Sequence, residues 1–313
     1  MVLAVGFTWA GPLAEGADQF PRQALVAVVL FLMSWSLDST ALFHAVRRPS
    51  AAVLGVAVNL LVVPLAAWCA ARVLPAPLDM GLMLTAALPC TLASAAVWTR
   101  RAGGNDAVAL VVTMVTNFGC FLFTPLLLWL MTGADVQDRL TTGQLVWRLF
   151  LIAVLPMAAG QLLRCLPPAA RWATRHKAAL STLCQLGILT MVLIGAVQSA
   201  LKLSSSGAGT TGWQGWLLML AAVVTVHLVA LYLGFGLGRG LQLPRADWIA
   251  VGLAGSQKTL MIGLDLALTL NLGIGILPMI AYHALQLVWD TLVADRLAAG
   301  PPANRPPPGD GSS

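Results

Sequence analysis

The sequence predicts an all-α polytopic membrane protein with about ten transmembrane helices. Its composition is 58% hydrophobic and only 10% charged, which is too apolar for a surface in contact with water. Apolar runs of about 20 residues, the length that crosses a bilayer, follow one another with short connections. We therefore expect one membrane domain over residues 1–300, with no sizeable soluble part.

The runs end at charged residues, Pro or Gly, which gives the order of the expected helices. The first run, Met1–Leu13, lacks the basic residues of a signal peptide, so we expect it to remain as a helix. It is shorter than a full span, and the natural start could lie upstream. The expected helices lie near residues 1–14, 22–42, 50–73, 79–98, 104–131, 144–165, 178–201, 213–238, 246–269 and 272–297. The tail, residues 301–313, is rich in Pro, Gly and Ser and is expected to be disordered.

Basic residues between the runs predict the orientation. If loops alternate between the two sides, one side receives 12 of the 18 Lys and Arg residues, the other receives 5, and Lys258 stays within the membrane. Because basic loops remain cytoplasmic, both termini are expected there, in a bacterial inner (plasma) membrane. The 12 residues are Arg47, Arg48, Arg100, Arg101, Arg164, Arg171, Arg175, Lys177, Arg239, Arg245, Arg296 and Arg305. They form no continuous stripe, so the net charge of +6 does not indicate nucleic-acid binding.

Two segments interrupt the apolar helices at corresponding places in the two halves of the chain. They are Leu88-Pro-Cys-Thr-Leu-Ala-Ser94 and Gly255-Ser-Gln-Lys-Thr-Leu260. Five helices before the midpoint and five after it predict two inverted repeats, over about residues 1–135 and 140–300. Broken backbone within a membrane is tolerated where it lines a cavity, so the two segments predict a binding site at the midplane. The candidate residues there are Thr91, Ser94, Ser256, Gln257, Lys258 and Thr259.

At these residues the sequence resembles the bile acid:sodium symporter family, and is most similar to the subgroup that contains the seventh vertebrate member, fungal calcium-homeostasis regulators and bacterial sodium-dependent transporters. The match also includes Thr99-Arg-Arg-Ala-Gly-Gly-Asn-Asp106 and Pro278-Met-Ile-Ala-Tyr-His-Ala-Leu-Gln286. The resemblance implies ten helices in a panel domain and a core domain, with the fourth and ninth helices unwound where they cross. It implies a secondary transporter that moves a small organic anion by alternating access.

The sodium sites of the family are only partly present. The resemblance places Ser94 and Thr113 at sodium-site positions, which would leave a weak site there. The Asn and Glu of the family are replaced by Ala95 and Ser256, and Glu15 is the sole glutamate of the chain. The coupling ion, sodium or proton, is therefore left open, and no cofactor is expected.

Lys258 is an ionisable residue inside an apolar span, where a charge is costly and usually faces polar groups. It either binds an anionic substrate or takes the place of a sodium ion. A structural ion pair, or a side chain that reaches the membrane surface, is the alternative. Burial would also allow proton coupling through this lysine.

Further polar residues follow helical spacing in apolar runs. His283, Gln286 and Asp290 share one side of the last helix, where they either bond neighbouring helices or relay protons or contact substrate. Thr113 and Asn117 present the same choice between interhelical bonding and ligand contact. Asp265 is expected to pair with another helix or to take part in coupling. The isolated His227 is assigned to packing.

Other classes of function have less support. The chain lacks H-E-x-x-H, G-x-S-x-G and phosphate-loop motifs, so an enzyme is not expected. Its five cysteines lack C-x-x-C spacing and indicate neither a disulfide framework nor zinc. The main alternative is a membrane regulator of calcium or ion homeostasis that acts on a partner protein. The expected partners are the lipid bilayer and a small organic anion whose identity the sequence does not give.

Overall fold

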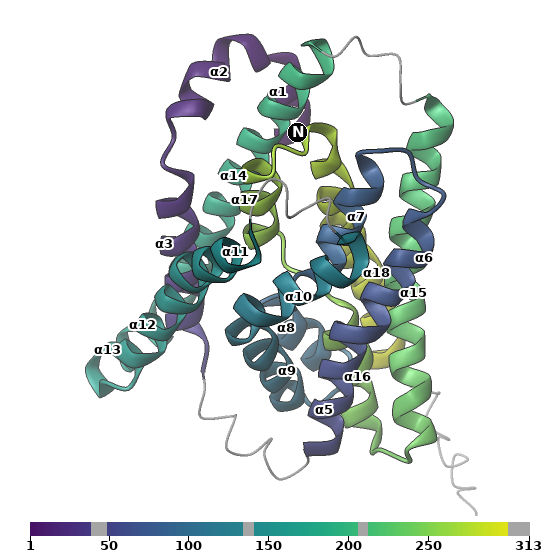
Figure 1. Ribbon diagram of the computed structural model, residues 1–313. Helices are drawn as coiled ribbons and strands as arrows, with labels where there is room; N and C mark the ends of the chain where they lie inside the picture. The colour runs from purple at the N-terminus through teal and green to yellow at the C-terminus, as the bar shows by residue number, and fades with distance from the viewer. Residues whose placement is uncertain (39–48, 134–140, 206–211, 300–313) are drawn as a thin grey trace, which may run out of the picture.

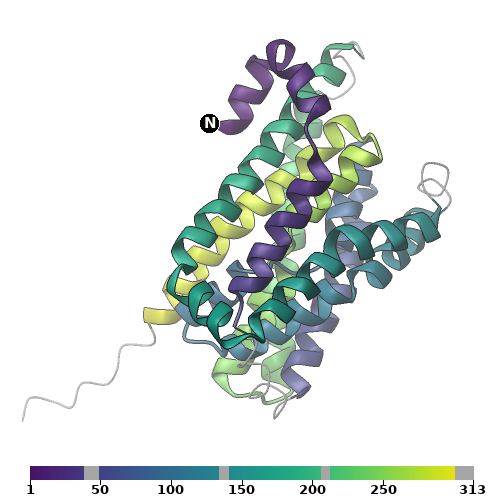
Figure 2. The ribbon, with the colours of Figure 1, turned by 90° about the vertical axis from the view of Figure 1, so that its left-hand side faces the viewer.

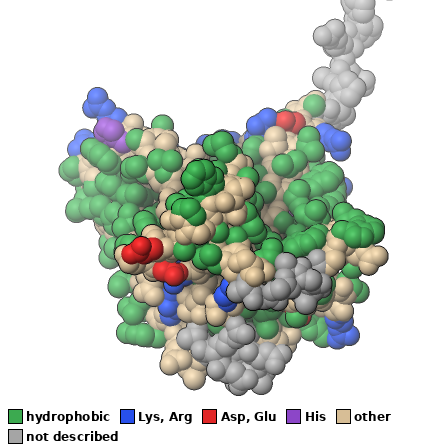
Figure 3. Space-filling view, turned by 90° about the horizontal axis from the view of Figure 1, so that it is seen from above, with side chains coloured by type: hydrophobic (Ala, Val, Ile, Leu, Met, Phe, Trp, Pro, Cys, Tyr) green, Lys and Arg blue, Asp and Glu red, His purple; other side chains and the backbone are tan. Residues whose placement is uncertain are grey.

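The structure, a computed structural model, describes residues 1–38, 49–133, 141–205 and 212–299. Every regular element in these ranges is a helix, as the sequence predicts. By length and composition, five of the described helices could cross a membrane, or six if one bent pair counts as a single span. Apolar side chains form much of the outline seen from one end of the bundle, which suits contact with lipid (Figure 3).

The helices lie in two groups (Figure 1). The first group is on the left of Figure 1 and contains the helices that pack around α14 and α3. Its members are α1 (Val2–Thr8), α2 (Ala10–Gln19), α3 (Arg22–Ser36), α11 (Thr142–Leu149), the π-helical turn η3 (Phe150–Val154), α12 (Leu155–Arg164), α13 (Pro167–Arg175) and α14 (Lys177–Ser205).

The second group surrounds the two interrupted segments. Its members are α5 (Pro49–Ala57), the π-helical turn η1 (Val58–Val62), α6 (Val63–Ala71), α7 (Leu78–Ala87), α8 (Ser94–Arg101), α9 (Asp106–Phe118), α10 (Cys120–Thr132), α15 (Trp213–Gly240), α16 (Arg245–Ser256), α17 (Met261–Thr269), the 3-10 turn η4 (Gly273–Ile276) and α18 (Leu277–Ala299). The two groups meet where α10 contacts α11 and where α14 contacts α17 and η4. One apolar core spans this boundary and includes Leu30, Leu88 and Leu264.

The start of the chain differs from the expected first span. The helix expected over 1–14 is broken at Trp9 into α1 and α2, each too short to cross a bilayer. The two pieces form a V at the upper end of the bundle, against α14 (Figure 2). The helix α1 packs closely on α14, because a Cβ added at Gly6 of α1 would lie 2.5 Å from the Ala196 Cβ of α14.

Three other expectations are corrected. The single helix expected over 104–131 bends by 73° at Gly119, between α9 and α10. The helix expected over 22–42 ends at Ser36, and residues 39–42 lie outside the described residues. The expected connection after residue 165 contains α13, which begins at Pro167 and whose Trp172 stacks on Trp35 at 5.0 Å.

Some of the sequence expectations fall outside the described residues. They are the disordered tail, residues 301–313, and the basic residues Arg47, Arg48, Arg139 and Arg305.

The expected spans over 50–73 and 144–165 each contain a π-helical turn just before a proline. A proline has no backbone N–H, so a carbonyl one turn earlier loses its partner, and a π turn is one way to absorb that loss. In the first of these spans the turn is η1 and the proline is Pro64.

Candidate transport site

Both helices that the sequence predicts to be interrupted are broken, and the two breaks touch. The chain leaves α7 after Ala87 and re-enters helix at Ser94; it leaves α16 after Ser256 and re-enters at Met261. The Thr259 N–H donates to the Pro89 carbonyl at 2.9 Å. The two broken elements run in opposite directions (Figure 1). The predicted contact between the two segments, called the crossing below, is therefore confirmed.

Lys258 is at the centre of the crossing and is 1% exposed. Its ammonium donates to three oxygens: the Asn59 carbonyl at 2.7 Å, the Asn59 Oδ1 at 3.1 Å and the Leu88 carbonyl at 2.8 Å. An ammonium has three protons, so all of its donors are used. The lysine thus joins η1 to the break after α7 and leaves no proton for an anion in this conformation.

Both backbone carbonyls that bind this lysine are left free by breaks in helical bonding. In η1, the Val63 N–H donates to Val58 rather than to Asn59, and the next residue, Pro64, has no N–H. The Leu88 carbonyl follows the end of α7, so no later turn of that helix supplies a donor. A buried carbonyl without a partner is costly, and Lys258 satisfies both.

Gln257 connects the crossing to a deeply buried acid. Its Oε1 accepts bonds from the Thr91 hydroxyl at 2.5 Å and the Ser94 hydroxyl at 2.8 Å. Its Nε2 donates to the Asp290 Oδ2 at 2.6 Å. The Asp290 Oδ1 lies 3.0 Å from the His227 Nε2. Of the five residues, Ser94 alone is partly exposed.

The helix α9 supports the first break. The Thr113 hydroxyl donates to the Thr91 carbonyl at 3.2 Å, and the Asn117 amide donates to the Cys90 carbonyl at 2.7 Å. Thr113 and Ser94, the expected weak sodium site, are both bonded to Thr91. Within the described part of the chain, no cluster of three or more His, Cys, Asp or Glu side chains is placed to hold a metal.

The polar stripe of α18 supports the second break. Gln286 forms two bonds to the backbone of Lys258, from its N–H at 2.9 Å and to its carbonyl at 3.0 Å. His283 bonds Gln286 in turn, and the Tyr282 hydroxyl donates to the Ser256 carbonyl at 2.8 Å. These bonds replace the ladder that the broken helix lacks. Bonds to other elements, the simpler interpretation of the stripe, are present for Gln286 and Asp290, whereas His283 bonds Gln286 within α18.

A family model described as the SBF-like CPA transporter family matches residues 1–299. The chain belongs to this family. An uncharacterized protein of Pseudomonas aeruginosa PAO1 is 28% identical over 228 residues, which are 71% of this chain and 66% of that protein. The protein named Putative symporter YfeH, of Escherichia coli K12, is 26% identical over 220 residues, 69% of this chain and 64% of that protein.

A vertebrate relative carries the name that the sequence resemblance suggests. Sodium/bile acid cotransporter 7 of Xenopus tropicalis is 22% identical over 273 residues, 84% of this chain and 78% of that protein. The resemblance to bile acid:sodium symporters is therefore confirmed at the level of the family. The chain spans slightly less than two thirds of the length of the two bacterial relatives. Like other members of this transporter family, it is a multi-pass membrane protein.

Asp265 lies outside the crossing of this SBF-like chain. Its Oδ2 accepts a bond from the Arg148 Nη2 at 2.7 Å, and the two side chains are 2% and 19% exposed. Reversing the Gln23 amide would add a third member to this cluster, with its oxygen 3.0 Å from the Arg148 Nη1. Arg148 belongs to the first group and Asp265 to the second, so the pair joins the two groups. The expected partner on another helix is confirmed.

Three residues of the network escaped sequence reasoning. Asn59 was hidden in an apolar run, although an isolated Asn five residues before a proline was a usable signal. His227 was assigned to packing, yet it faces Asp290. Arg148 was counted as a loop charge, yet it is largely buried against Asp265. The pairing partners of His227 and Arg148 are 63 and 117 residues away, a separation that local spacing cannot reveal.

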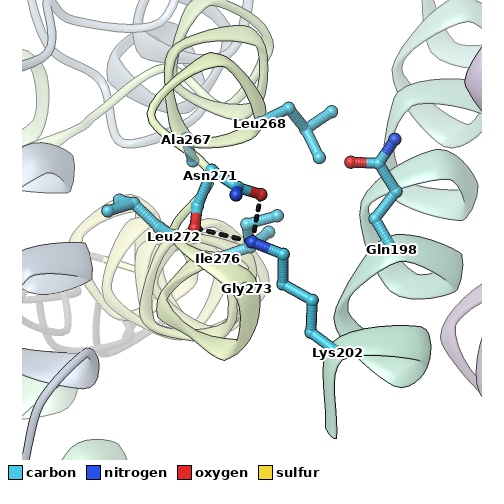
Figure 4. A pocket seen from close by; sticks show the side chains of 8 residues that line it. All are labelled: Gln198, Lys202, Ala267, Leu268, Asn271, Leu272, Gly273 and Ile276. Atoms are coloured by element: carbon cyan, nitrogen blue, oxygen red, sulfur yellow. Dashed lines mark hydrogen bonds between the residues drawn. The ribbon is translucent and has the colours of Figure 1, made fainter. Parts of the chain in front are cut away.

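A shallow hollow lies between α14 and the end of α17 (Figure 4). The Lys202 ammonium reaches across it to the Asn271 carbonyl at 2.8 Å and also bonds the Asn271 side chain. None of its lining residues belongs to the crossing. The hollow is therefore separate from the crossing.

Proposed function

We propose that this chain is a secondary active transporter of a small organic anion, in which the Lys258 ammonium replaces one coupling cation. The observation that carries the proposal is the cage of three oxygens around Lys258 Nζ, at 2.7–3.1 Å. Carbonyl and amide oxygens are the ligands that a hard cation such as sodium would use. Here a side chain of the protein itself fills that place.

The surroundings of the cage favour a positive charge. The Leu88 carbonyl follows the C-terminal end of α7, where the helix dipole is negative. The relative from Xenopus tropicalis is named for sodium cotransport. A fixed ammonium at the crossing would repel sodium from the same place, so we expect little or no sodium dependence. Broken helices that meet within the membrane are the usual location of ion and substrate sites in secondary transporters.

The two groups of helices provide the moving parts. We assign the first group to the panel domain and the second to the core domain, in ten helices arranged as two inverted repeats. The opposite directions of the two broken elements support this arrangement. Alternating access would then move one group against the other, and the Arg148–Asp265 pair spans the boundary between them.

An anionic substrate suits the positive groups at this boundary. The N-terminal ends of α8 and α17 lie beside the crossing and carry partial positive charge. Arg148 presents a guanidinium that a substrate carboxylate or sulfonate could bind in place of Asp265. The Asp265 carboxylate and a substrate carboxylate or sulfonate all present paired anionic oxygens. The N–H groups of the Arg148 guanidinium can therefore bind any of them.

The orientation follows from the ends of the helices. The last turns of α8, α15 and α18 carry Arg100, Arg101, Arg239 and Arg296, and α16 begins at Arg245. All of these ends lie toward the bottom of Figure 1. Basic residues remain cytoplasmic, so we assign the lower end to the cytoplasm of a bacterial inner membrane. Because α1 lies at the upper end (Figure 1), this assignment puts the start of the chain on the other side of the membrane and departs from the expectation that both termini are cytoplasmic.

Purified protein in liposomes tests the proposal. A panel of radiolabelled carboxylates and sulfonates is offered with sodium, potassium or choline outside. We expect uptake of at least one anion at the same rate in all three salts. Uptake that stops without sodium would refute the cation replacement, and no uptake of any anion would favour the regulatory alternative.

A further inference from the structure

The pair formed by His227 and Asp290 is the most buried set of ionisable side chains outside the lysine cage. His227 is 1% exposed and Asp290 is 0% exposed. The His227 Nε2 faces Asp290 Oδ1, and the His227 Nδ1 is buried with no hydrogen-bond partner among the described residues. An unpartnered ring nitrogen beside a buried carboxylate has room for one more proton.

We propose that the His227–Asp290 pair binds one proton from the aqueous phase, and that Gln257 transmits the protonation state of the pair to the crossing. This inference rests on the proposed function in one respect only: it supplies the coupling ion of a transporter that does not need sodium. The proton binding itself can be measured without any substrate.

The bond pattern around Gln257 shows how the signal would pass. With Asp290 ionised, its Oδ2 accepts from the Gln257 amide nitrogen, and the Gln257 oxygen accepts from Thr91 and Ser94. If a proton is bound at Oδ2, that oxygen becomes a donor and faces another donor. Reversing the amide removes this clash, because its oxygen then accepts from Asp290 and its NH₂ faces two hydroxyls that rotate to accept.

The network therefore has two self-consistent arrangements, one with the Asp290 carboxyl ionised and one with it protonated. The proton can be held by the carboxyl or by the ring, and in either case it belongs to the pair as a unit. When the ring holds it, the pair becomes an imidazolium bound to a carboxylate, and the Gln257 amide keeps its present direction. The amide reversal thus reports the fraction held by Asp290.

The net charge around Gln257 changes by one unit when the pair binds a proton. Lys258 is adjacent to Gln257 in the chain, so the ionised carboxylate of Asp290 is balanced by one ammonium, and one added proton leaves a net charge of +1. The other titratable or charged groups on α15, on α18 and on the elements that pack against these two helices are Cys69 on α6, Asp79 on α7, Arg100 and Arg101 on α8, Tyr232 and Arg239 on α15, Arg245 and Asp247 on α16, and Tyr282, His283, Asp295 and Arg296 on α18. Arg101 pairs with Asp295, away from the network.

Potentiometric titration of detergent-solubilised protein tests the proton site. The wild-type protein is compared with Asp290→Asn between about pH 5 and pH 9, where an exposed carboxyl does not titrate. We expect the wild type to bind about one proton more than the variant within this window. The matched control is Asp247→Asn, which changes a carboxyl that is 2% exposed but lies outside the pair, and it should show no difference. Equal proton uptake by wild type and Asp290→Asn would overturn the proposal.

Hydrogen–deuterium exchange tests the transmission. The Ala95 N–H donates to the Thr91 hydroxyl at 3.2 Å and so reports on the hydroxyls that face Gln257. After correction for intrinsic pH dependence, exchange in the segment around Ala95 should change across the titration of the pair. In Gln257→Met, which has no amide, this change should vanish while the proton is still bound. An unchanged pH response in that variant would overturn the role of Gln257. Anion uptake that fails while both measurements succeed would refute the transporter function alone.

Discussion

Replacing Lys258 by alanine should turn the lysine cage into a sodium site. The substitution removes a charge that is 1% exposed and leaves the Asn59 carbonyl, the Asn59 Oδ1 and the Leu88 carbonyl without their donor. Each buried acceptor without a partner costs about 1–3 kcal/mol. The cost of burying the ammonium disappears at the same time, so we expect a net loss near the lower end of the sum, about 3–5 kcal/mol.

Sodium should restore part of this loss, because the truncated side chain leaves space beside three oxygens. An ion at ten times its dissociation constant stabilises by about 1.4 kcal/mol, and at one hundred times by about 2.7 kcal/mol. Thermal unfolding in NaCl and KCl measures this difference. Lys258→Met is the matched control, because its side chain fills the space and provides no charge, so it should be destabilised in both salts alike.

Two outcomes would refute this reasoning. Lys258→Ala that is as stable as the wild type would show that the three bonds contribute nothing. A sodium response that is already strong in the wild type, and is the same in Lys258→Ala, would show that sodium binds at a different place and that the lysine does not replace it.

Two further predictions concern the contacts between helices. Arg148→Leu and Asp265→Leu should each lower the free energy of unfolding by about 3–5 kcal/mol, because each leaves a buried charge without its partner. The double variant should lose less than the sum of the two single losses. Additive losses in chemical unfolding would contradict a direct pair. Gly81→Ala should be strongly destabilising, since its Cβ would lie 1.9 Å from the Gly275 carbonyl oxygen. Gly236→Ala, on the open side of α15 with no atom within 4 Å, should be neutral or more stable by about 0.5–1 kcal/mol.

The general plan of this protein could be predicted from the sequence because the signals for it are local. Apolar run lengths give most of the helices, and Pro89 together with the polar residues after it marks the first break. Lys258 could be recognised as unusual because a charge within an apolar run is rare. These inferences need only the chemistry of neighbouring residues.

The partners of those residues could not be predicted, because each bond joins distant parts of the chain. The sequence left several interpretations of Lys258 open: an anion ligand, a substitute cation, a structural ion pair, a side chain that reaches the membrane surface, or a proton carrier. Its contact with Asn59, which lies 199 residues away, could not be seen from the sequence. The bends at Trp9 and Gly119 were also missed. Neither has a strong local signal, and each depends on how the following helix packs.

The positions of Lys258 and Asp290 on either side of Gln257 suggest how a transporter of this family could change its coupling ion. A sodium site changes its charge when the ion binds or leaves, and this change can be coupled to substrate transport. A fixed ammonium in place of sodium removes that coupling unless another group binds and releases an ion. In the proposal above, the pair of Asp290 and His227 is that group. Gln257 bonds Asp290 directly, and its neighbour in the chain is Lys258. A variant that lacks both ionisable partners, His227→Gln with Asp290→Asn, should therefore still fold around the lysine cage but exchange its anion without any response to a pH gradient. We expect this variant to keep counterflow of labelled anion and to lose pH-driven accumulation, which would separate the coupling step from substrate binding. If pH-driven accumulation persists in the variant, the coupling proton binds elsewhere.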